Sequence, residues 1–489
     1  MSVSYPQKPY LRYSQLSVNI PTLMIQLQPL QRTCRTFKEP ALDVLWKGVN
    51  GFKTLLSCLP KGVFTRTSEG KLSLTHPLFT GEWNTLNQYA RRIHFPRICC
   101  SNLNDISDRV VQALIFAPPL LPNLRSLQWL DNRGFLPLLH TLLIPTTRSM
   151  ILGQYNYWDP SFVKSALLAS LGARCPSIQK LRADVEGGSD AMSEVICGWR
   201  NLIYLNTGVL DTRALAHLAS LSSLKSLHFI SYDYVDDTPR NVHFLGCRSA
   251  VLSMDDSDSQ LPYDPDIPDL IVSLSECFPA ALEKLSIQVQ VDPDDLRHHH
   301  FSFVFDVIAP LLSFSCLRKL DLDWLCTTDI DDDALKSMAQ SWPQLEIFRF
   351  GAATALLDSP SATFTGFIHL IRYCRHLHEI MMYFRACPID INSEPFSKTI
   401  PNENITYIEV GDSPIVDSIA VACQIHSLLP SLSHVDYGYW VWMWALEQPS
   451  IIALEDEWNR VNQYLRVLTK GAEIREKMGE LSQECSLTA

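Results

Sequence analysis

The sequence predicts an α/β solenoid with parallel strands on one face and helices on the other, and three observations support this. Leucine accounts for 68 of the 489 residues, whereas glycine accounts for only 19. The phrase L-x-x-L-x-Φ, in which Φ is apolar or aromatic, recurs along the chain. Segments with helical spacing of apolar residues lie between the copies. Repetition of this kind indicates stacked structural units.

Ten copies carry the phrase, and each is expected to form one strand. The copies begin at Leu121, Cys175, Trp199, Leu221, Leu282, Leu317, Leu345, Leu377, Ile405 and Leu432. The last five are spaced by 28, 32, 28 and 27 residues, in or near the period of about 20–29 residues that leucine-rich repeats show. Two long gaps leave room for degenerate copies at Ser149–Leu152 and Ala250–Met254. The sequence therefore predicts a leucine-rich-repeat solenoid.

The alternation within each copy explains why the units must stack. Successive strand side chains point to opposite faces, so Leu320 and Leu322 should point inward. One strand cannot bury its inner face alone, and a neighbouring repeat must cover it. Helices should return the chain, with Asp211, the run from Asp331 to Asp333, and Thr363 at their starts. The alternative is a leucine-rich α/β domain without repeats, which ten copies disfavour.

The domain organisation follows from where the repeats begin and end. We expect a flexible tail over 1–14, N-terminal helices over 15–60, a helical connecting region over 61–115, the solenoid over 116–440, and a helical cap and tail over 441–489. An acidic stretch near 255–266 is predicted to be a flexible insertion.

The C-terminal segment is predicted to close the solenoid. Residues 451–478 have apolar side chains at helical spacing, among them Trp458, Val461 and Leu465, as expected of a helix that shields the open end of a repeat array. The aromatic cluster from Tyr437 to Trp444 could be part of this cap or a partner-binding site. We favour the cap.

Composition limits the class of partner. The formal net charge is −11, which disfavours a surface that follows nucleic-acid phosphates. No stretch of eighteen apolar residues and no secretory signal is evident, so we expect no membrane partner. The fourteen cysteines have no C-x-x-C pair, which fits reduced thiols and a cytoplasmic or nuclear location.

Motifs for catalysis, metals and cofactors are missing from the sequence. No P-loop, dinucleotide-binding, H-E-x-x-H or G-x-S-x-G pattern is present. The run from Asp329 to Asp333 lacks the glycine and glutamate of an EF-hand and is better explained as a helix N-cap. His298, His299 and His300 are adjacent and favour a solvated loop over a metal site. We therefore expect no enzyme activity and no cofactor, with an undetected active site as a remote alternative.

The N-terminal segment should contain two short helices. A first helix would end before Pro40, which suits the first turn of a second helix whose apolar side carries Leu42, Leu45 and Trp46. On structural grounds alone, these two helices would form a helical cap on the first repeat.

The same segment resembles a known family. The run from Cys34 to Trp46 is similar to the second half of an F-box, and the chain resembles fungal F-box proteins with C-terminal leucine-rich repeats. Leu74-Thr-His-Pro77, Glu82-Trp83 and the run from Tyr89 to Ile93 match the usual continuation. The resemblance implies a substrate-recognition subunit of an SCF-type cullin-RING ubiquitin ligase that binds a Skp-type adaptor and a target protein. Its adaptor-binding or F-box core residues would be Leu30, Cys34, Phe37, Pro40, Leu42, Leu45 and Trp46.

The opening of the box departs from that pattern, and a second function stays open. The usual Leu-Pro and acidic residue are replaced here by the run from Asn19 to Ile25. The alternative is therefore a leucine-rich-repeat interaction scaffold without ligase association.

The later repeats supply a candidate partner-binding face. Strand alternation places one set of polar residues on the side of the sheet opposite the inward leucines. Acids outnumber bases in this set, which favours a basic peptide or protein surface as the target. Its members are Lys319, Asp321, Arg349, Glu379, Tyr383, Tyr407, Glu409, His434 and Asp436.

Overall fold

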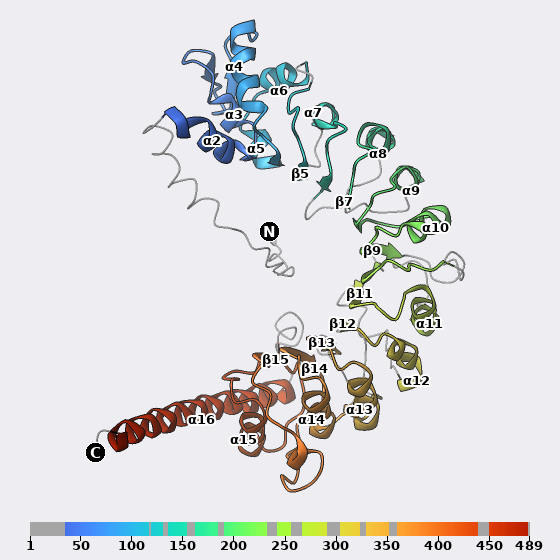
Figure 1. Ribbon diagram of the computed structural model, residues 1–489, viewed down its shortest axis with the longest axis vertical. Coiled ribbons are helices and arrows are strands. Elements are labelled where there is room, and N and C mark those ends of the chain that lie inside the picture. Colours follow the sequence, from blue (N-terminus) through green and yellow to red (C-terminus); the bar gives the residue numbers. More distant parts are fainter. Residues whose placement is uncertain are drawn as a thin grey trace. The chain divides into compact units, whose positions relative to one another are not determined.

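The predicted α/β leucine-rich-repeat solenoid is confirmed. The computed structural model describes residues 35–116, 119–130, 135–153, 162–183, 190–231, 242–255, 267–290, 304–322, 329–351, 359–438 and 449–487. Thirteen strands follow one another in chain order as β1, β4, β5, β6 and β7 to β15, and helices alternate with them (Figure 1). The chain forms two compact units, unit 1 at residues 1–156 and unit 2 at residues 157–489.

Unit 1 contains four strands of this sheet and a separate hairpin. Strands β1, β4, β5 and β6 pair in parallel, and β2 pairs antiparallel with β3. Its elements are α2 (Arg35–Trp46), β1 (Gly48–Asn50), α3 (Lys53–Leu56), β2 (Phe64–Arg66), β3 (Leu72–Leu74), α4 (Thr80–Ala90), β4 (Phe95–Cys99), α5 (Cys100–Asn104), α6 (Asp108–Ile115), β5 (Ser126–Leu130), α7 (Leu136–Leu142) and β6 (Ser149–Leu152).

Two expectations for this region were wrong. The connecting region 61–115 is not only helical, because β2 and β3 form a hairpin there and β4 joins the parallel sheet ahead of residue 116. The chain also does not break at Pro40, which lies inside the single helix α2. A proline inside a helix costs about 3 kcal/mol, but Pro40 deletes only the bond to Thr36 near the helix start. Burial of Ala41, Leu42 and Leu45 on the opposite side offsets that loss.

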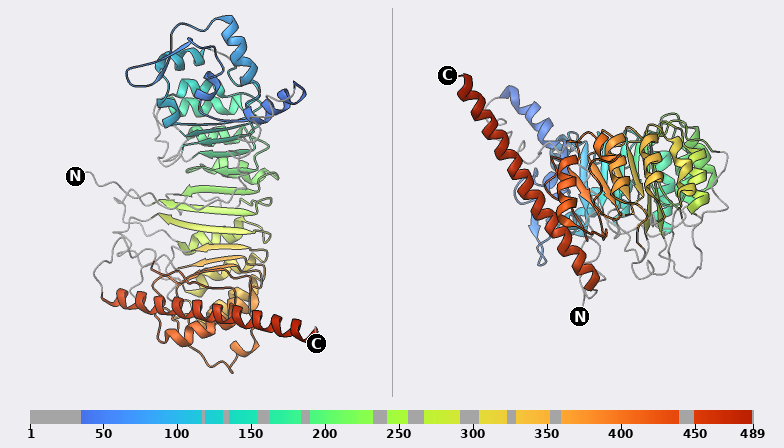
Figure 2. Two further views of the ribbon diagram at one scale, coloured as in Figure 1. Left: turned by 90° about the vertical axis from the view of Figure 1, so that its left-hand side faces the viewer. Right: turned by 90° about the horizontal axis from the view of Figure 1, so that it is seen from below.

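Unit 2 repeats a strand and a helix along its length. Figure 2 shows its helices on one side of the strands. Its elements are α8 (Phe162–Arg174), β7 (Lys180–Ala183), α9 (Asp190–Cys197), β8 (Tyr204–Asn206), α10 (Thr212–Ser220), β9 (Ser226–Ser231), β10 (Ser249–Asp255), α11 (Ile267–Cys277), β11 (Lys284–Gln290), α12 (Phe305–Ile308), η2 (Ala309–Ser313), β12 (Lys319–Leu322), α13 (Asp332–Ser341), β13 (Ile347–Phe350), α14 (Phe364–Tyr373), β14 (Glu379–Met382), η3 (Phe396–Lys398), β15 (Tyr407–Glu409), α15 (Ser418–Leu428) and α16 (Pro449–Leu487).

The alternation inferred from the leucine phrase is present in the strands. Leu320, Leu322, Phe348 and Ile380 are fully buried between sheet and helices. The two degenerate copies are real strands, because Ser149–Leu152 forms β6 and Ala250–Met254 lies inside β10. The core is therefore a continuous layer to which each repeat contributes alternate side chains.

The predicted helix starts are also confirmed. The Asp211 carboxylate accepts a hydrogen bond from the Ala214 N–H at 2.6 Å, and Asp331 accepts one from Ala334 at 2.8 Å. Thr363 caps α14 through the N–H of Thr365. These side chains satisfy amide groups that have no partner within the first turn of a helix.

Asp332 links two consecutive repeats. Its Oδ1 accepts hydrogen bonds from the N–H groups of Thr363 at 2.7 Å and Gly366 at 2.9 Å, and its Oδ2 accepts one from the Thr363 hydroxyl at 2.6 Å. A Cβ on Gly366 would lie 2.5 Å from Leu335 Cδ1. A larger residue at position 366 would therefore displace the side chain of Leu335 and the Asp332 carboxylate that links the two repeats.

Within the region predicted as a helical cap, 441–489, the structure has the helix α16, which packs against α15 of the last repeat. Trp458, Val461 and Leu465 on α16 are buried, and α16 crosses the end of unit 2 (Figure 2). Trp458 Nε1 donates to the Ser413 carbonyl at 2.8 Å. The Asn462 carboxamide accepts from the Val435 N–H at 2.8 Å and donates to the Val435 C=O at 2.9 Å. These are the two hydrogen bonds that a further parallel strand would make to Val435.

Several predicted features lie outside the described residues. They are the tail at 1–14, Cys326 of the best repeat, His298 to His300, most of the insertion near 255–266 and the aromatic cluster beyond Gly438.

Candidate partner-binding face

The sheet face of unit 2 opposite the helices carries two rows of side chains over β12 to β15. Strand register places Lys319, Ile347, Glu379 and Tyr407 in one row. Asp321, Arg349, Met381 and Glu409 form the second row, which continues to Asp436 through an isolated bridge. The sheet thus brings most of the predicted partner-binding residues onto one face.

Four of these residues form an ion-pair ladder across three strands: Lys319, Asp321, Arg349 and Glu379. The Asp321 carboxylate lies 3.1 Å from Lys319 Nζ and 3.6 Å from Arg349 Nη1. Arg349 also donates to Glu379 Oε1 from Nε at 2.7 Å and from Nη2 at 2.6 Å. The Asp321 side chain is only 5% exposed. Both cations of the ladder are therefore engaged with carboxylates of the same face.

The carboxylate end of the face, defined as Tyr407, Glu409, His434 and Asp436, is built differently. The Tyr407 hydroxyl donates to Glu409 Oε2 at 2.8 Å, and His434 Nε2 lies 2.9 Å from Asp436 Oδ1. Among the described residues, no lysine or arginine forms an ion pair with Glu409 or Asp436. This end therefore presents carboxylates whose hydrogen-bond partners are a tyrosine and a histidine.

Electrostatics at the carboxylate end disfavour full ionisation. Burial raises the pKa of Glu409 and the Asp436 carboxylate adds to the rise, while the hydrogen bond from Tyr407 and the charge of Arg349 oppose it. Burial and then Glu409 raise the pKa of Tyr407. Nearby, burial and the Glu455 carboxylate raise the pKa of Asp412 to about 6. A cation brought by a partner would relieve this repulsion.

Burial changes the predicted role of some members of the set. Tyr383 is only 7% exposed and Glu409 only 4% exposed, so neither is a free surface group. Tyr383 follows the end of β14 and lies beside the buried Phe384. The accessible members are Tyr407, His434 and Asp436. Tyr407 is 36% exposed, and the side chains of His434 and Asp436 are 48% and 40% exposed.

Sequence reasoning missed a second polar cluster on the same face, which we call the histidine network: Asn206, His228, Ser253 and Gln288. Asn206 Nδ2 lies 2.7 Å from His228 Nδ1 and can only donate there, so the ring proton is on Nε2, 2.8 Å from Ser253 Oγ. Ser253 Oγ lies 3.5 Å from Gln288 Oε1. Burial and the nearby Arg182 lower the pKa of His228 to about 4.

A sequence signal for this network does exist. His228 stands between Leu227 and Phe229, the same place in the repeat that Asp321 has between Leu320 and Leu322. Strand register aligns the residues in that place with Asp321, on the sheet face opposite the helices. Comparing this place across all copies, instead of only the later ones, would have found His228 and Asn206.

The predicted F-box core residues have different environments in unit 1. Leu42 and Leu45 are buried and hold α2 against the unit. Trp46 is half-buried, with its ring centroid 4.8 Å from that of Tyr89. Pro40 is exposed. Leu30 and Cys34 lie outside the described residues, and the side chain of Phe37 is not described.

Arg92, two residues after the end of α4, holds α2 in place through ion pairs. Its guanidinium donates to the carboxylates of Glu39 and Asp43, which lie one helical turn apart on α2. Burial opposes the charge of Arg92, but the two carboxylates raise its pKa. Among the side chains of α2 that the structure describes, Val44 is a large apolar residue left exposed, at 49%. An adaptor contact through α2 would therefore involve Pro40 and Val44, while Leu42 and Leu45 support the helix.

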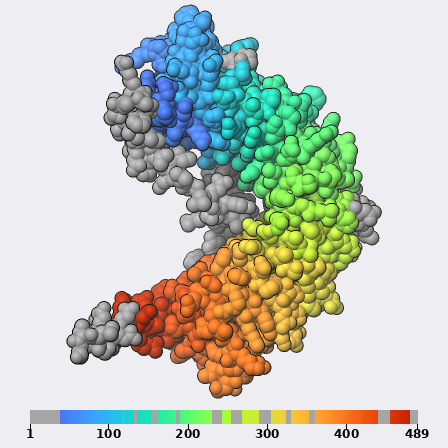
Figure 3. Space-filling view, viewed as in Figure 1, coloured from blue at the N-terminus to red at the C-terminus, as the bar shows by residue number. Residues whose placement is uncertain are grey.

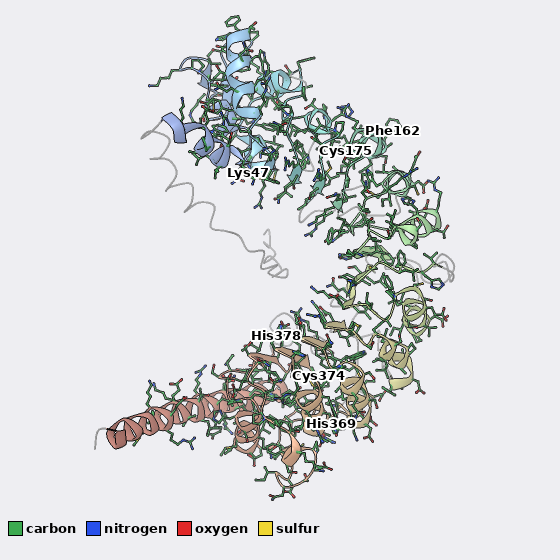
Figure 4. All side chains as sticks on the ribbon, viewed as in Figure 1. Lys47, Phe162, Cys175, His369, Cys374 and His378 are labelled. Atoms are coloured by element: carbon green, nitrogen blue, oxygen red, sulfur yellow. The ribbon has the colours of Figure 1, made fainter. Side chains whose placement is uncertain are left out.

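The described residues contain no metal centre or membrane span. No group of three or more His, Cys, Asp or Glu side chains in the described ranges could hold a metal ion. No helix within those ranges is both long enough and apolar enough to cross a membrane. Figure 4 shows His369 on α14 and His378 before β14. Burial lowers the pKa of His369.

Comparisons with known proteins find similarity at the level of the fold. No family model and no curated protein matches the chain. The yeast Rad7 and Elc1 complex matches with a TM-score of 0.42 and 14% identity over 87% of this chain and 93% of that chain. The TLR13–ssRNA13 complex matches with a TM-score of 0.36 and 12% identity, over 72% of this chain and 47% of that chain. At these values neither structure bears on the partners of this chain.

Proposed function

We propose that this chain is a non-catalytic recognition subunit of an SCF-type cullin-RING ubiquitin ligase. In this proposal the sheet face of unit 2 holds a basic segment of a target protein. The N-terminal residues around α2 contact a Skp-type adaptor, which fits the F-box resemblance of Cys34 to Trp46. A repeat scaffold without ligase association is the alternative.

One observation supports a basic target. The cations of the ion-pair ladder already contact carboxylates, whereas the hydrogen-bond and ion-pair partners of Glu409 and Asp436 within the described ranges are Tyr407 and His434. Burial raises the pKa of Glu409, and the Asp436 and Glu379 carboxylates add to this, while Tyr407 and Arg349 oppose it. An additional cation beside Asp436 would favour the ionised carboxylates further. A lysine or arginine of a target placed over Tyr407 would complete this cluster with charge-assisted hydrogen bonds.

The target side is tested with a fluorescent oligolysine peptide and an oligoglutamate peptide of equal length. We expect the full chain to bind oligolysine, and Asp436→Lys to weaken that binding by about tenfold or more at low salt. Glu403→Lys is the matched control, because Glu403 is exposed and precedes β15 outside the two rows. Equal binding by both variants would remove the carboxylate end from the proposal.

The adaptor side is tested separately by co-purification of the full chain with a Skp-type adaptor. We expect Val44→Glu to abolish capture, because Val44 is an exposed apolar side chain of α2. Val163→Glu on α8 makes the same change at a 58% exposed position of unit 2 and should have no effect. If the wild-type chain captures no adaptor, the ligase assignment fails while the target-binding result still stands.

A further inference from the structure

The C-terminal half of α16 carries a second apolar stripe, separate from the one that packs on the repeats. Val467 is 70% exposed and Ile474 is 52% exposed, while Trp458, Val461 and Leu465 on the other side are buried. A Cβ on Gly471 would meet nothing within 4 Å. Figure 3 shows this end of α16, in red, reaching beyond the side chains of the repeats of unit 2.

The stripe has the spacing of a coiled-coil seam. Val467, Gly471, Ile474 and Met478 follow one another at intervals of four, three and four residues. Residues at these intervals lie on one side of a helix and repeat every seven positions. Met478 is 62% exposed. Burying such a seam against another helix is the usual reason for this spacing.

Charges beside the stripe indicate the kind of partner. Lys470 and Lys477 flank the seam on one side and Arg475 flanks it on the other, and all three are exposed. Glu473 and Glu476 lie farther round the helix, away from the seam. Flanking positions of this type pair with the flanking positions of the partner helix. The seam therefore fits a helix with acidic flanks.

The same charges argue against a second copy of this chain. In a parallel pair Lys470 of one copy would face Arg475 of the other, and in an antiparallel pair each basic residue would face another basic one. Like charges at these positions are destabilising. We infer that the stripe Val467–Gly471–Ile474 of α16 is a docking surface for an amphipathic helix of a partner protein that carries acidic residues on both sides of its apolar seam.

The experiment uses the full chain and two synthetic helical peptides of about three heptads with leucine at the seam positions. One peptide has glutamate at the flanking positions and the other has lysine. We expect only the glutamate peptide to bind in fluorescence anisotropy, and Ile474→Glu to weaken it by about tenfold or more. Lys470→Glu combined with Lys477→Glu should shift the preference to the lysine peptide.

Controls separate docking from damage to the fold. Glu476→Lys changes a charge on the opposite side of the helix and should leave glutamate-peptide binding within about twofold. Circular dichroism should be equal for all variants, since the substituted side chains are exposed. Equal binding of both peptides, or no binding of either, overturns the inference. A wild-type dimer in sedimentation that Ile474→Glu dissociates also overturns it, because the occupant would then be a second copy.

Discussion

The histidine network and the carboxylate end occupy the same face of unit 2, but burial shifts the pKa values of their titratable groups in opposite directions. In the network, burial favours the neutral imidazole of His228, and its neighbours Asn206 and Ser253 match that state with one donor and one acceptor. At the carboxylate end, burial favours the protonated form of Glu409, and the neighbouring Asp436 carboxylate adds to that effect. The hydrogen bonds of the first cluster are satisfied within the chain, whereas we propose that the second cluster binds a cation of a partner.

The largest expected effect concerns the strand that supports the carboxylate end. Asn462→Ala should lower the free energy of unfolding by about 2–4 kcal/mol, because the buried N–H and C=O of Val435 lose their partners. Urea unfolding measures this. Gln463→Ala, at the next and exposed position of α16, is the control and should change the free energy little. A loss no larger than that of the control would mean that the cap does not hold the last strand.

Acidification tests the histidine network. Its folded-state pKa of about 4 lies below the ordinary value of 6.5, so the unfolded chain binds more protons between these values. Stability should therefore fall by about 2–3 kcal/mol from this residue as the pH drops from 7 to 4. His228→Gln should remove that part of the pH dependence. His243→Gln, an exposed position, should retain it, and identical pH profiles for the two variants would contradict the assignment.

Asp412 should change the stability with pH in the opposite direction from His228. Its folded-state pKa of about 6 lies above the ordinary value of 3.8, so the folded chain binds more protons between these values and loses stability as the pH rises. Asp412→Asn should raise the free energy of unfolding by about 1–2 kcal/mol at pH 7 and leave it nearly unchanged below pH 4. Thermal unfolding at both pH values measures this. If Asp412→Asn were less stable than the wild type at pH 7, the predicted direction of the effect would be wrong.

The smallest effect on stability is expected at Glu409 itself. Glu409→Gln keeps an acceptor for the Tyr407 hydroxyl but removes a charge beside Asp436. Stability at pH 7 should rise slightly, because the neutral amide avoids the cost of burying a charge, while oligolysine binding should weaken. A variant that binds oligolysine as well as the wild type would place the cation site elsewhere on the face.

Most of the architecture could be predicted from sequence because the repeat pattern is local. Alternation within four residues decides which side chains point inward, and it placed Leu320 and Phe348 in the core without knowledge of the neighbouring strands. The pairing of Asp321 with Arg349 could also have been predicted, since both occupy the same place in successive repeats. The helix starts at Asp211 and Asp331 depend on three adjacent residues.

The remaining features depend on contacts that the repeat pattern does not encode. Tyr383 was expected to be accessible, but it follows the last residue of β14, where alternation no longer applies. Pro40 was expected to separate two helices, but burial of Leu42 and Leu45 maintains one. Asn462 acts on a residue 27 positions earlier in the chain. Its role depends on how α16 is rotated against the last repeat, which the apolar spacing alone leaves open.

The carboxamide of Asn462 has a consequence for how the protein behaves at high concentration. Val435 belongs to the final segment of the sheet, and its outward N–H and C=O would otherwise be available to a strand of another molecule. Exposed edges of this kind are templates for runaway association into fibres. By occupying both groups with a side chain, α16 removes from Val435 the two backbone groups to which a strand of another molecule could bond.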